Sequence, residues 1–213
     1  MPQGLKTKLK RPAESFTSEV PQAGALRATQ LARRKRIVAA AMDLAAQGGY
    51  EAVQMRDVAR RAKVALGTLY KYFSSKDQLL AYAWADWSQG LQEHLWRHPI
   101  RGANRADRIM DFVRRATRAL EREPRLASAL LKSMLVPDSS AEEPRKEVSA
   151  VMGRVVEEEL APLQPTDREG IRDILGQVWY ANLLLWINGR TPLTRLYENM
   201  ETACRLLISH HEA

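Results

Sequence analysis

The segment 56–76 carries side chains whose types and spacing suit contact with double-stranded DNA. Two short apolar patterns, joined by a turn at Lys63 and Val64, have the proportions of a helix-turn-helix. In that motif the second helix enters the major groove with its N-terminal residues at the base edges. Val64, Leu69 and Phe73 are expected to face inward, which leaves the polar residues between them facing outward.

The outward residues offer three kinds of contact. Ala65 and Gly67 are small enough for the backbone to approach DNA closely, and Thr68 offers a hydroxyl and a methyl group to base edges. Longer side chains add hydroxyl groups and positive charge that suit bases and phosphates. These are Tyr70, Lys71, Tyr72 and Lys76.

Net charge separates the first third of the chain from the rest. Residues 1–76 hold 15 basic and 5 acidic side chains, whereas residues 77–213 hold 18 and 20. This asymmetry favours a segment that binds a polyanion, joined to a body that does not. The alternative from another class is a sequence-blind architectural protein, which would be expected to spread basic charge over its body.

A basic run precedes the motif at residues 33–36. We interpret Arg33, Arg34 and Arg36 as contacts to phosphate or to the minor groove, as made by arms of such domains. The alternative is a solvated charged face at the start of a helix.

The chain is predicted to be all-α, because apolar residues recur at helical spacing and alternating strand patterns are lacking. Residues 1–27 are expected to form a disordered basic tail, residues 28–76 the DNA-binding headpiece, and residues 77–213 the body. The predicted helices cover about 31–48, 55–62, 66–73, 76–91, 109–120, 126–134, 148–160, 166–187 and 193–207.

Several helix ends have sequence signals. Gly48 and Gly49 are predicted to end the first helix. Ser75 with Gln78, and Thr166 with Glu169, match the capping box that begins a helix.

The helix at 166–187 is apolar on more than one face, which requires cover on two sides. One interpretation is a central core helix. We favour a helix that packs on its own body and on a second subunit, so the chain is expected to form a homodimer through helices near 146–160 and 167–188.

At residues 50–80, YEAVQMRDVARRAKVALGTLYKYFSSKDQLL, the sequence resembles the TetR family of bacterial transcriptional regulators. The resemblance is most specific in GTLYKYF (67–73). GGYEAVQMR (48–56) with VALGTLYKYF (64–73) most resembles the KstR-type regulators of cholesterol catabolism in actinobacteria, and VWYANLLLWINGR (178–190) is a further similarity in the body. Two residues depart from the common pattern: Lys63 replaces the glycine of the turn, and Ala65 replaces a serine or threonine cap.

The resemblance implies a repressor that binds a palindromic operator as a dimer and is released by a hydrophobic small molecule. Position by position, it implies base or phosphate contacts from Arg56, Thr68, Tyr70, Lys71, Tyr72 and Lys76. A steroid or fatty acyl-CoA thioester is the expected class, with lipid or sterol catabolism genes as targets; the alternative is an efflux or unrelated operon with another apolar ligand. Large apolar residues of the body are the expected pocket lining, with ordinary core positions as the alternative. Arg114, Arg115 and Arg118 are candidates for contact with CoA phosphates, and the alternative for them is a solvent-facing helix surface. The lining residues are Trp84, Trp87, Leu91, Met110, Val113, Leu130, Met134, Trp179, Leu183 and Trp186.

Other functions have little support in the sequence. We expect no enzyme, since GxSxG, HExxH, CxxC and a phosphate-binding glycine loop are absent. His94 and His98 have metal-ligand spacing but lack a third ligand, so no metal or cofactor is expected. The single cysteine, Cys204, and the lack of a membrane-length apolar run predict a cytoplasmic protein, associated with the nucleoid when bound to DNA.

Overall fold

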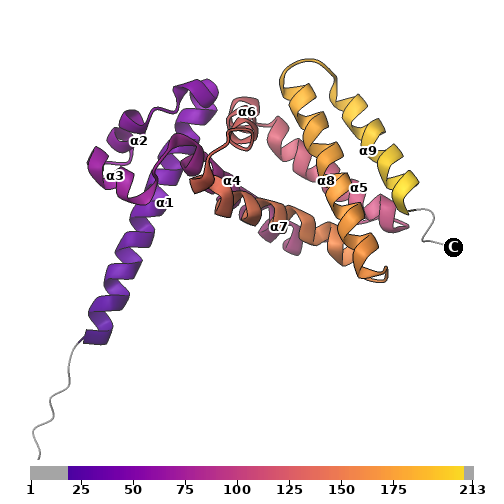
Figure 1. Cartoon of the computed structure of the whole chain (residues 1–213), viewed down its shortest axis with the longest axis horizontal. Coiled ribbons are helices and arrows are strands. Elements are labelled where there is room, and N and C mark those ends of the chain that lie inside the picture. Colours follow the sequence, from indigo (N-terminus) through magenta and orange to yellow (C-terminus); the bar gives the residue numbers. More distant parts are fainter. Residues whose placement is uncertain (1–18, 209–213) are drawn as a thin grey trace, which may run out of the picture. The chain divides into compact units, whose positions relative to one another are not determined.

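The computed structural model describes residues 19–208, with side chains from Arg27 onward except at Trp96. The described residues form helices and turns without a strand, which confirms the all-α prediction (Figure 1). The first helices are α1 (Glu19–Ala52), α2 (Met55–Arg61), α3 (Leu66–Tyr72) and α4 (Lys76–Arg97). They are followed by α5 (Arg105–Glu121), α6 (Pro124–Ser133), the 3₁₀ turn η1 (Ser139–Ala141), α7 (Glu142–Glu159), α8 (Pro165–Ile187) and α9 (Leu193–Ile208).

The chain divides into two units, one that ends at Arg34 and one that begins at Lys35. In the first unit, α1 begins at Glu19, so residues 19–27 are helical where a disordered tail was expected. Pro21 lies in the first turn of α1. Backbone N–H groups in a first turn have no acceptor within the helix, so a proline there loses no hydrogen bond. The remainder of the expected tail, residues 1–18, lies outside the described residues.

Helix ends in the second unit follow local chemistry. Gly49 has φ 71° and interrupts α1 where the double glycine predicted an end. Ser75 is the N-cap of α4, and its hydroxyl accepts a hydrogen bond from the Gln78 backbone N–H. The second expected capping box is wrong: α8 starts at Pro165 with Gln164 as its N-cap, so Thr166 lies within the first turn.

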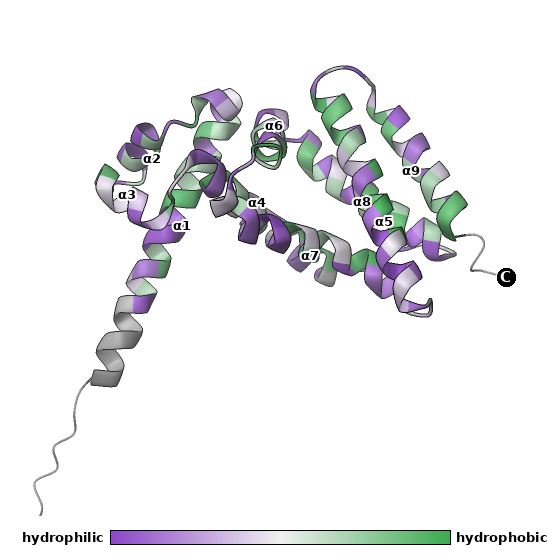
Figure 2. Ribbon diagram, viewed as in Figure 1, coloured by the Kyte–Doolittle hydropathy of each residue, from purple (hydrophilic) through white to green (hydrophobic). Residues whose placement is uncertain are grey.

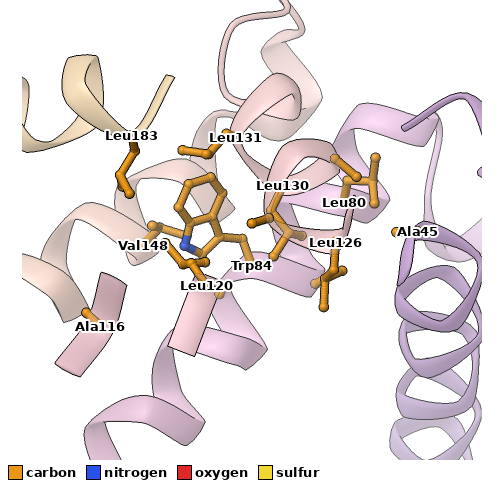
Figure 3. Close-up of a cluster of buried hydrophobic side chains, with 14 of the residues drawn as sticks. Ala45, Leu80, Trp84, Ala116, Leu120, Leu126, Leu130, Leu131, Val148 and Leu183 are labelled. Carbon is orange, nitrogen blue, oxygen red and sulfur yellow. The ribbon is translucent and has the colours of Figure 1, made fainter. Parts of the chain in front are cut away.

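The body is a bundle in which α4 packs against α6 and α7, while α5 and α8 each pack against α6, α7 and α9. Each body helix carries both apolar and polar residues, as expected for helices with one buried face (Figure 2). Trp84 of α4 lies at the centre of the core among five apolar side chains (Figure 3). These are Leu120, Leu130, Leu131, Val148 and Leu183.

Helices α7 and α8 differ in what covers them. The apolar stripe of α7, expected to join a dimer interface, is buried inside its own chain at Val148, Val151 and Val156. It packs against α4, α5 and α8, so those three side chains are covered by their own chain, and a dimer interface through this helix stays a prediction. By contrast, α8 buries Leu175 and leaves Ile174 45% exposed.

Candidate nucleic-acid interface and cavity

Helices α2 and α3 pack against each other through a small apolar core. Val58 and Ala59 of α2 are buried, and so are Leu69 of α3 and Phe73 directly after it. Phe73 also meets Tyr82 of α4 edge to face, with ring centroids 5.6 Å apart. The inward face of α3 is thus held against α2 and α4, which fixes what its other face presents.

The outward face of α3 presents small, hydroxyl-bearing and basic residues to solvent. Gly67 and Lys71 are exposed, Tyr70 is 50% exposed, and Thr68 is half-buried. A Cβ atom built on Gly67 would meet nothing within 4 Å, so the backbone there is open to an approaching groove. Ala65 just before α3 and Arg56 on α2 are also exposed, whereas Tyr72 is half-buried against the core.

The turn between the two helices has a left-handed backbone at the residue that replaces the glycine of the common pattern. Lys63 has φ 55° and is the one non-glycine residue with a positive φ among the described residues. Its N–H donates to Arg60 O at 3.2 Å, and the Val64 N–H donates to Ala59 O at 3.0 Å. This pair of bonds is a Schellman motif, which satisfies the last carbonyls of α2. Ala65 caps α3 without a side-chain hydrogen bond, as its residue type requires.

Lys76 lies at the junction of α1 and α4. Its Nζ is 3.7 Å from the Tyr50 ring centroid and 3.4 Å from the Tyr50 carbonyl oxygen. The Tyr50 hydroxyl donates to Asp77 Oδ1 at 2.6 Å, and burial followed by this carboxylate raises the pKa of Tyr50. Lys76 therefore stabilises this junction within the protein, in addition to the DNA contact predicted for it.

The basic run is divided between the two units. Arg33 and Arg34 are half-buried at the end of the first unit, and Arg36 is exposed in the second.

The body contains a cavity of about 760 Å³ between α4, α5, α7 and α8. Six residues predicted for the pocket line it: Trp84, Trp87, Val113, Met134, Trp179 and Leu183. The other four lie outside the lining: Met110 and Leu130 are buried in the core, and Leu91 and Trp186 pack partly buried against it. Residues of α5 and α7 that sequence reasoning missed include Phe112 and Met152, which had the same helical spacing as ordinary core residues.

The cavity opens at a polar rim formed by α7 and α8. Arg172 pairs with Glu157 and with Asp173 Oδ1, the latter at 2.8 Å, and these carboxylates raise the pKa of Arg172. Arg154 is exposed at the same rim and forms no ion pair with any described residue. The three arginines expected to meet phosphates are not in the lining. Arg114 pairs with Glu201, Arg115 pairs with Asp111 at 2.6 Å, and Arg118 is exposed.

Two hydrogen bonds link the body to the headpiece. The Ser75 hydroxyl, at the start of α4, donates to Asp138 in the segment that follows α6. The Arg125 guanidinium of α6 donates to the Gln47 carbonyl oxygen, in the last turn of α1 before Gly49, at 2.5 Å. A shift of α6 relative to α4 would therefore disturb groups on both sides of α2 and α3.

Other candidate chemistry has structural explanations. The rings of His94 and His98 stack with centroids 4.5 Å apart, and residues 27–208 contain no cluster of three potential metal ligands. Cys204 is buried, which raises the pKa of its thiol to about 11. In the described part of the chain, no helix is long and apolar enough to cross a membrane.

Family models match both parts of the chain. Residues 37–83 match the model for bacterial regulatory proteins of the tetR family, and residues 102–207 match a tetracyclin repressor-like C-terminal domain. The HTH-type transcriptional repressor KstR of Rhodococcus jostii is 37% identical over 180 residues, which covers 84% of each chain. KstR of Mycobacterium tuberculosis is 37% identical over 185 residues, 86% of this chain and 84% of that one.

Solved structures share the fold. A TetR transcriptional regulator from Rhodococcus sp. RHA1 superimposes with a TM-score of 0.77 at 27% identity, over 84% of this chain and 97% of that one. FadR of Thermus thermophilus, a TetR-family repressor in complex with lauroyl-CoA, has a TM-score of 0.68 at 24% identity, over 82% and 93%.

Proposed function

The chain belongs to the TetR family of bacterial regulators, and on this premise we propose that it is a dimeric repressor released from its operator by an apolar small molecule. The observation that carries the proposal is the 760 Å³ cavity whose wall includes α4. Helix α4 begins four residues after α3 ends, so a ligand that moves α4 acts on the DNA-reading helix directly.

The lining supports an apolar effector with an anionic end. Tryptophan, phenylalanine and methionine side chains form the interior, which favours a bulky hydrocarbon group. Arg154 at the rim is available to an anionic group such as a phosphate, because it has no ionic partner among the described residues. A steroid or fatty acyl-CoA thioester combines these features, and control of lipid or sterol catabolism genes follows from it. The fold itself accommodates an acyl-CoA in FadR of Thermus thermophilus.

Release requires the ligand to bind the conformation with low DNA affinity more tightly than the other. Two headpieces on a two-fold axis would read half-sites about 34–36 Å apart. We infer that ligand in the cavity shifts α4 and changes the separation of the two α3 helices.

A gel-shift titration tests the effector class. The complex of the protein with operator DNA is titrated with a cholesterol-derived acyl-CoA and with lauroyl-CoA, and CoA alone serves as the control. Release by a thioester and not by CoA supports the proposal. If neither thioester releases DNA, the ligand class is wrong, and the efflux or unrelated-operon alternative takes its place.

Replacement of Thr68 and Lys71 tests sequence-specific binding against the architectural alternative. In a specific regulator, Thr68→Ala with Lys71→Ala lowers operator affinity far more than affinity for random DNA, because base contacts are lost. Arg60→Ala is a matched control, since Arg60 is exposed on α2 and pairs with Asp57 at 2.9 Å. An equal loss on both DNAs would favour sequence-blind binding.

A further inference from the structure

One buried hydrogen-bond donor in the cavity wall has no partner. The indole nitrogen of Trp84 is buried and makes no hydrogen bond with any described residue, and the whole residue is only 5% exposed. The other buried indole of the wall is satisfied: Trp179 Nε1 donates to Thr117 Oγ1 at 3.1 Å. The half-buried Tyr180 hydroxyl donates to the Leu131 carbonyl oxygen at 3.0 Å. Of the two buried indoles of the wall, that of Trp84 therefore lacks an acceptor among the described residues.

The indole N–H lies among hydrocarbon groups that also line the cavity. In Figure 3 the nitrogen of Trp84 points toward Val148 and Leu120, and both residues belong to the lining. Neither side chain can accept a hydrogen bond. A buried donor without an acceptor is unfavourable, and phenylalanine would fill this position without that cost.

A second unpartnered group lies one turn away on α4. Ser88 is fully buried, and its hydroxyl has no hydrogen-bond partner among the described residues. Residues four apart share a helix face, but Ser88 does not belong to the cavity lining, so Trp84 carries the unpartnered donor of the wall on this face.

We propose that Trp84 is a specificity-determining residue, which donates a hydrogen bond to a carbonyl or hydroxyl oxygen within the buried, apolar part of the effector. This inference rests on the proposed function in taking the cavity as the effector site. It selects oxygenated hydrocarbons over saturated alkyl chains, whose buried part would leave the indole N–H unpaired.

Camphor and bornane test the proposal, because these compact apolar molecules differ only by a ketone oxygen. Wild-type protein is expected to bind camphor about ten-fold more tightly than bornane, as one hydrogen bond to a buried donor would give. Trp84→Phe is expected to abolish this preference. Trp87→Phe is the matched control, since it removes another indole of the α4 wall and should keep the preference.

A spectroscopic measurement avoids reliance on the variants. In a ¹H–¹⁵N spectrum, the Trp84 indole signal, assigned through its contacts with Val148 and Leu120, should move downfield with camphor and stay in place with bornane. The proposal is overturned if camphor moves other cavity signals but not this one, if both probes bind equally, or if neither binds. These outcomes are independent of operator release by acyl-CoAs, so failure of the proposed function is recognised separately.

Discussion

Two helices, α2 and α8, end in the same hydrogen-bonded turn but place different residues at its left-handed position. In α8 that residue is Gly189, with φ 68°, and the N–H groups of Gly189 and Arg190 donate to Trp186 and Leu185. In α2 it is Lys63, with φ 55°. A side chain in this conformation costs free energy that glycine does not, so the DNA-reading motif contains local backbone strain.

Lys63→Gly is therefore expected to raise the free energy of unfolding by about 1 kcal/mol. Urea denaturation followed by circular dichroism measures the change. Gly189→Ala is the reciprocal control and should lower stability by a similar amount. A destabilised Lys63→Gly would show that the lysine side chain contributes more than its backbone conformation costs.

Cys204 makes the stability depend on pH in the alkaline range. Its pKa rises from 9.0 to about 11 in the fold because of burial, so the folded state keeps the thiol proton to higher pH than the unfolded chain. This stabilisation is fully present below about pH 9 and is lost as the pH rises through 11, a change of about 2–3 kcal/mol.

Cys204→Ala is expected to be less stable at pH 7 but to lose less stability between pH 8 and 11 than the wild type. Chemical denaturation at a series of pH values compares the two slopes. Parallel slopes would mean that the thiol titrates alike in the folded and unfolded states.

At the scale of elements, the periodicity of apolar residues was enough to place the helices. The interruption of α1 and the start of α4 were predicted because Gly49 and Ser75 carry strong local signals. The start of α8 was missed because Pro165 fits the first helical position better than Thr166 fits the cap. Propensity could not predict that α1 begins at Glu19.

The cavity was less predictable than the helices. A tryptophan that lines a cavity and one that fills the core have the same spacing, and only tertiary packing separates Trp179 from Trp186. Similarly, Lys76 has the residue type of a phosphate contact, but its position over the Tyr50 ring depends on the junction of α1 with α4. The stripe of α7 carried no sign that its own chain would cover it.

The bond from Ser75 to Asp138 is expected to couple the body to α4. The hydroxyl of Ser140 and then that of Ser75 hold the pKa of Asp138 below its usual range, so the carboxylate is charged at neutral pH. Asp138→Ala removes this link but leaves the Ser75 cap on Gln78 N intact. It should preserve operator binding and weaken ligand-induced release, measured by gel shift with an active thioester.

Comparison of Asp138→Ala with Ser75→Ala separates capping from coupling. Ser75→Ala removes both the N-cap and the link, and the loss of the cap alone should lower the free energy of unfolding by about 1 kcal/mol. Equal release by wild type and Asp138→Ala would show that coupling runs through other contacts, such as Arg125 with Gln47.

At the scale of the molecule, the exposed apolar residues of α8 predict how two chains meet. Ile174 and Leu185 are 45% and 37% exposed, and they lie eleven residues apart on one helix face together with exposed Ala181. Such a stripe suits a two-fold interface in which each α8 packs on its counterpart.

Ile174→Asp is expected to give a monomer and to weaken operator binding about a hundred-fold, because two linked headpieces bind two half-sites together. Light scattering and gel shift measure the two effects. Leu135→Asp is the matched control, since Leu135 is 59% exposed but lies after α6. A dimeric Ile174→Asp would place the interface on another surface.

The single cysteine of the chain has a practical consequence for measuring motion. Cys204 is 1% exposed, and its thiol stays protonated at neutral pH, so thiol reagents should not modify it in the folded protein. A cysteine introduced at the exposed residue Gln54, the N-cap of α2, would then be the one reactive site in each protomer. Nitroxide labels at that site would report the distance between the two headpieces by pulsed electron paramagnetic resonance, with and without ligand, in a protein that keeps its native cysteine.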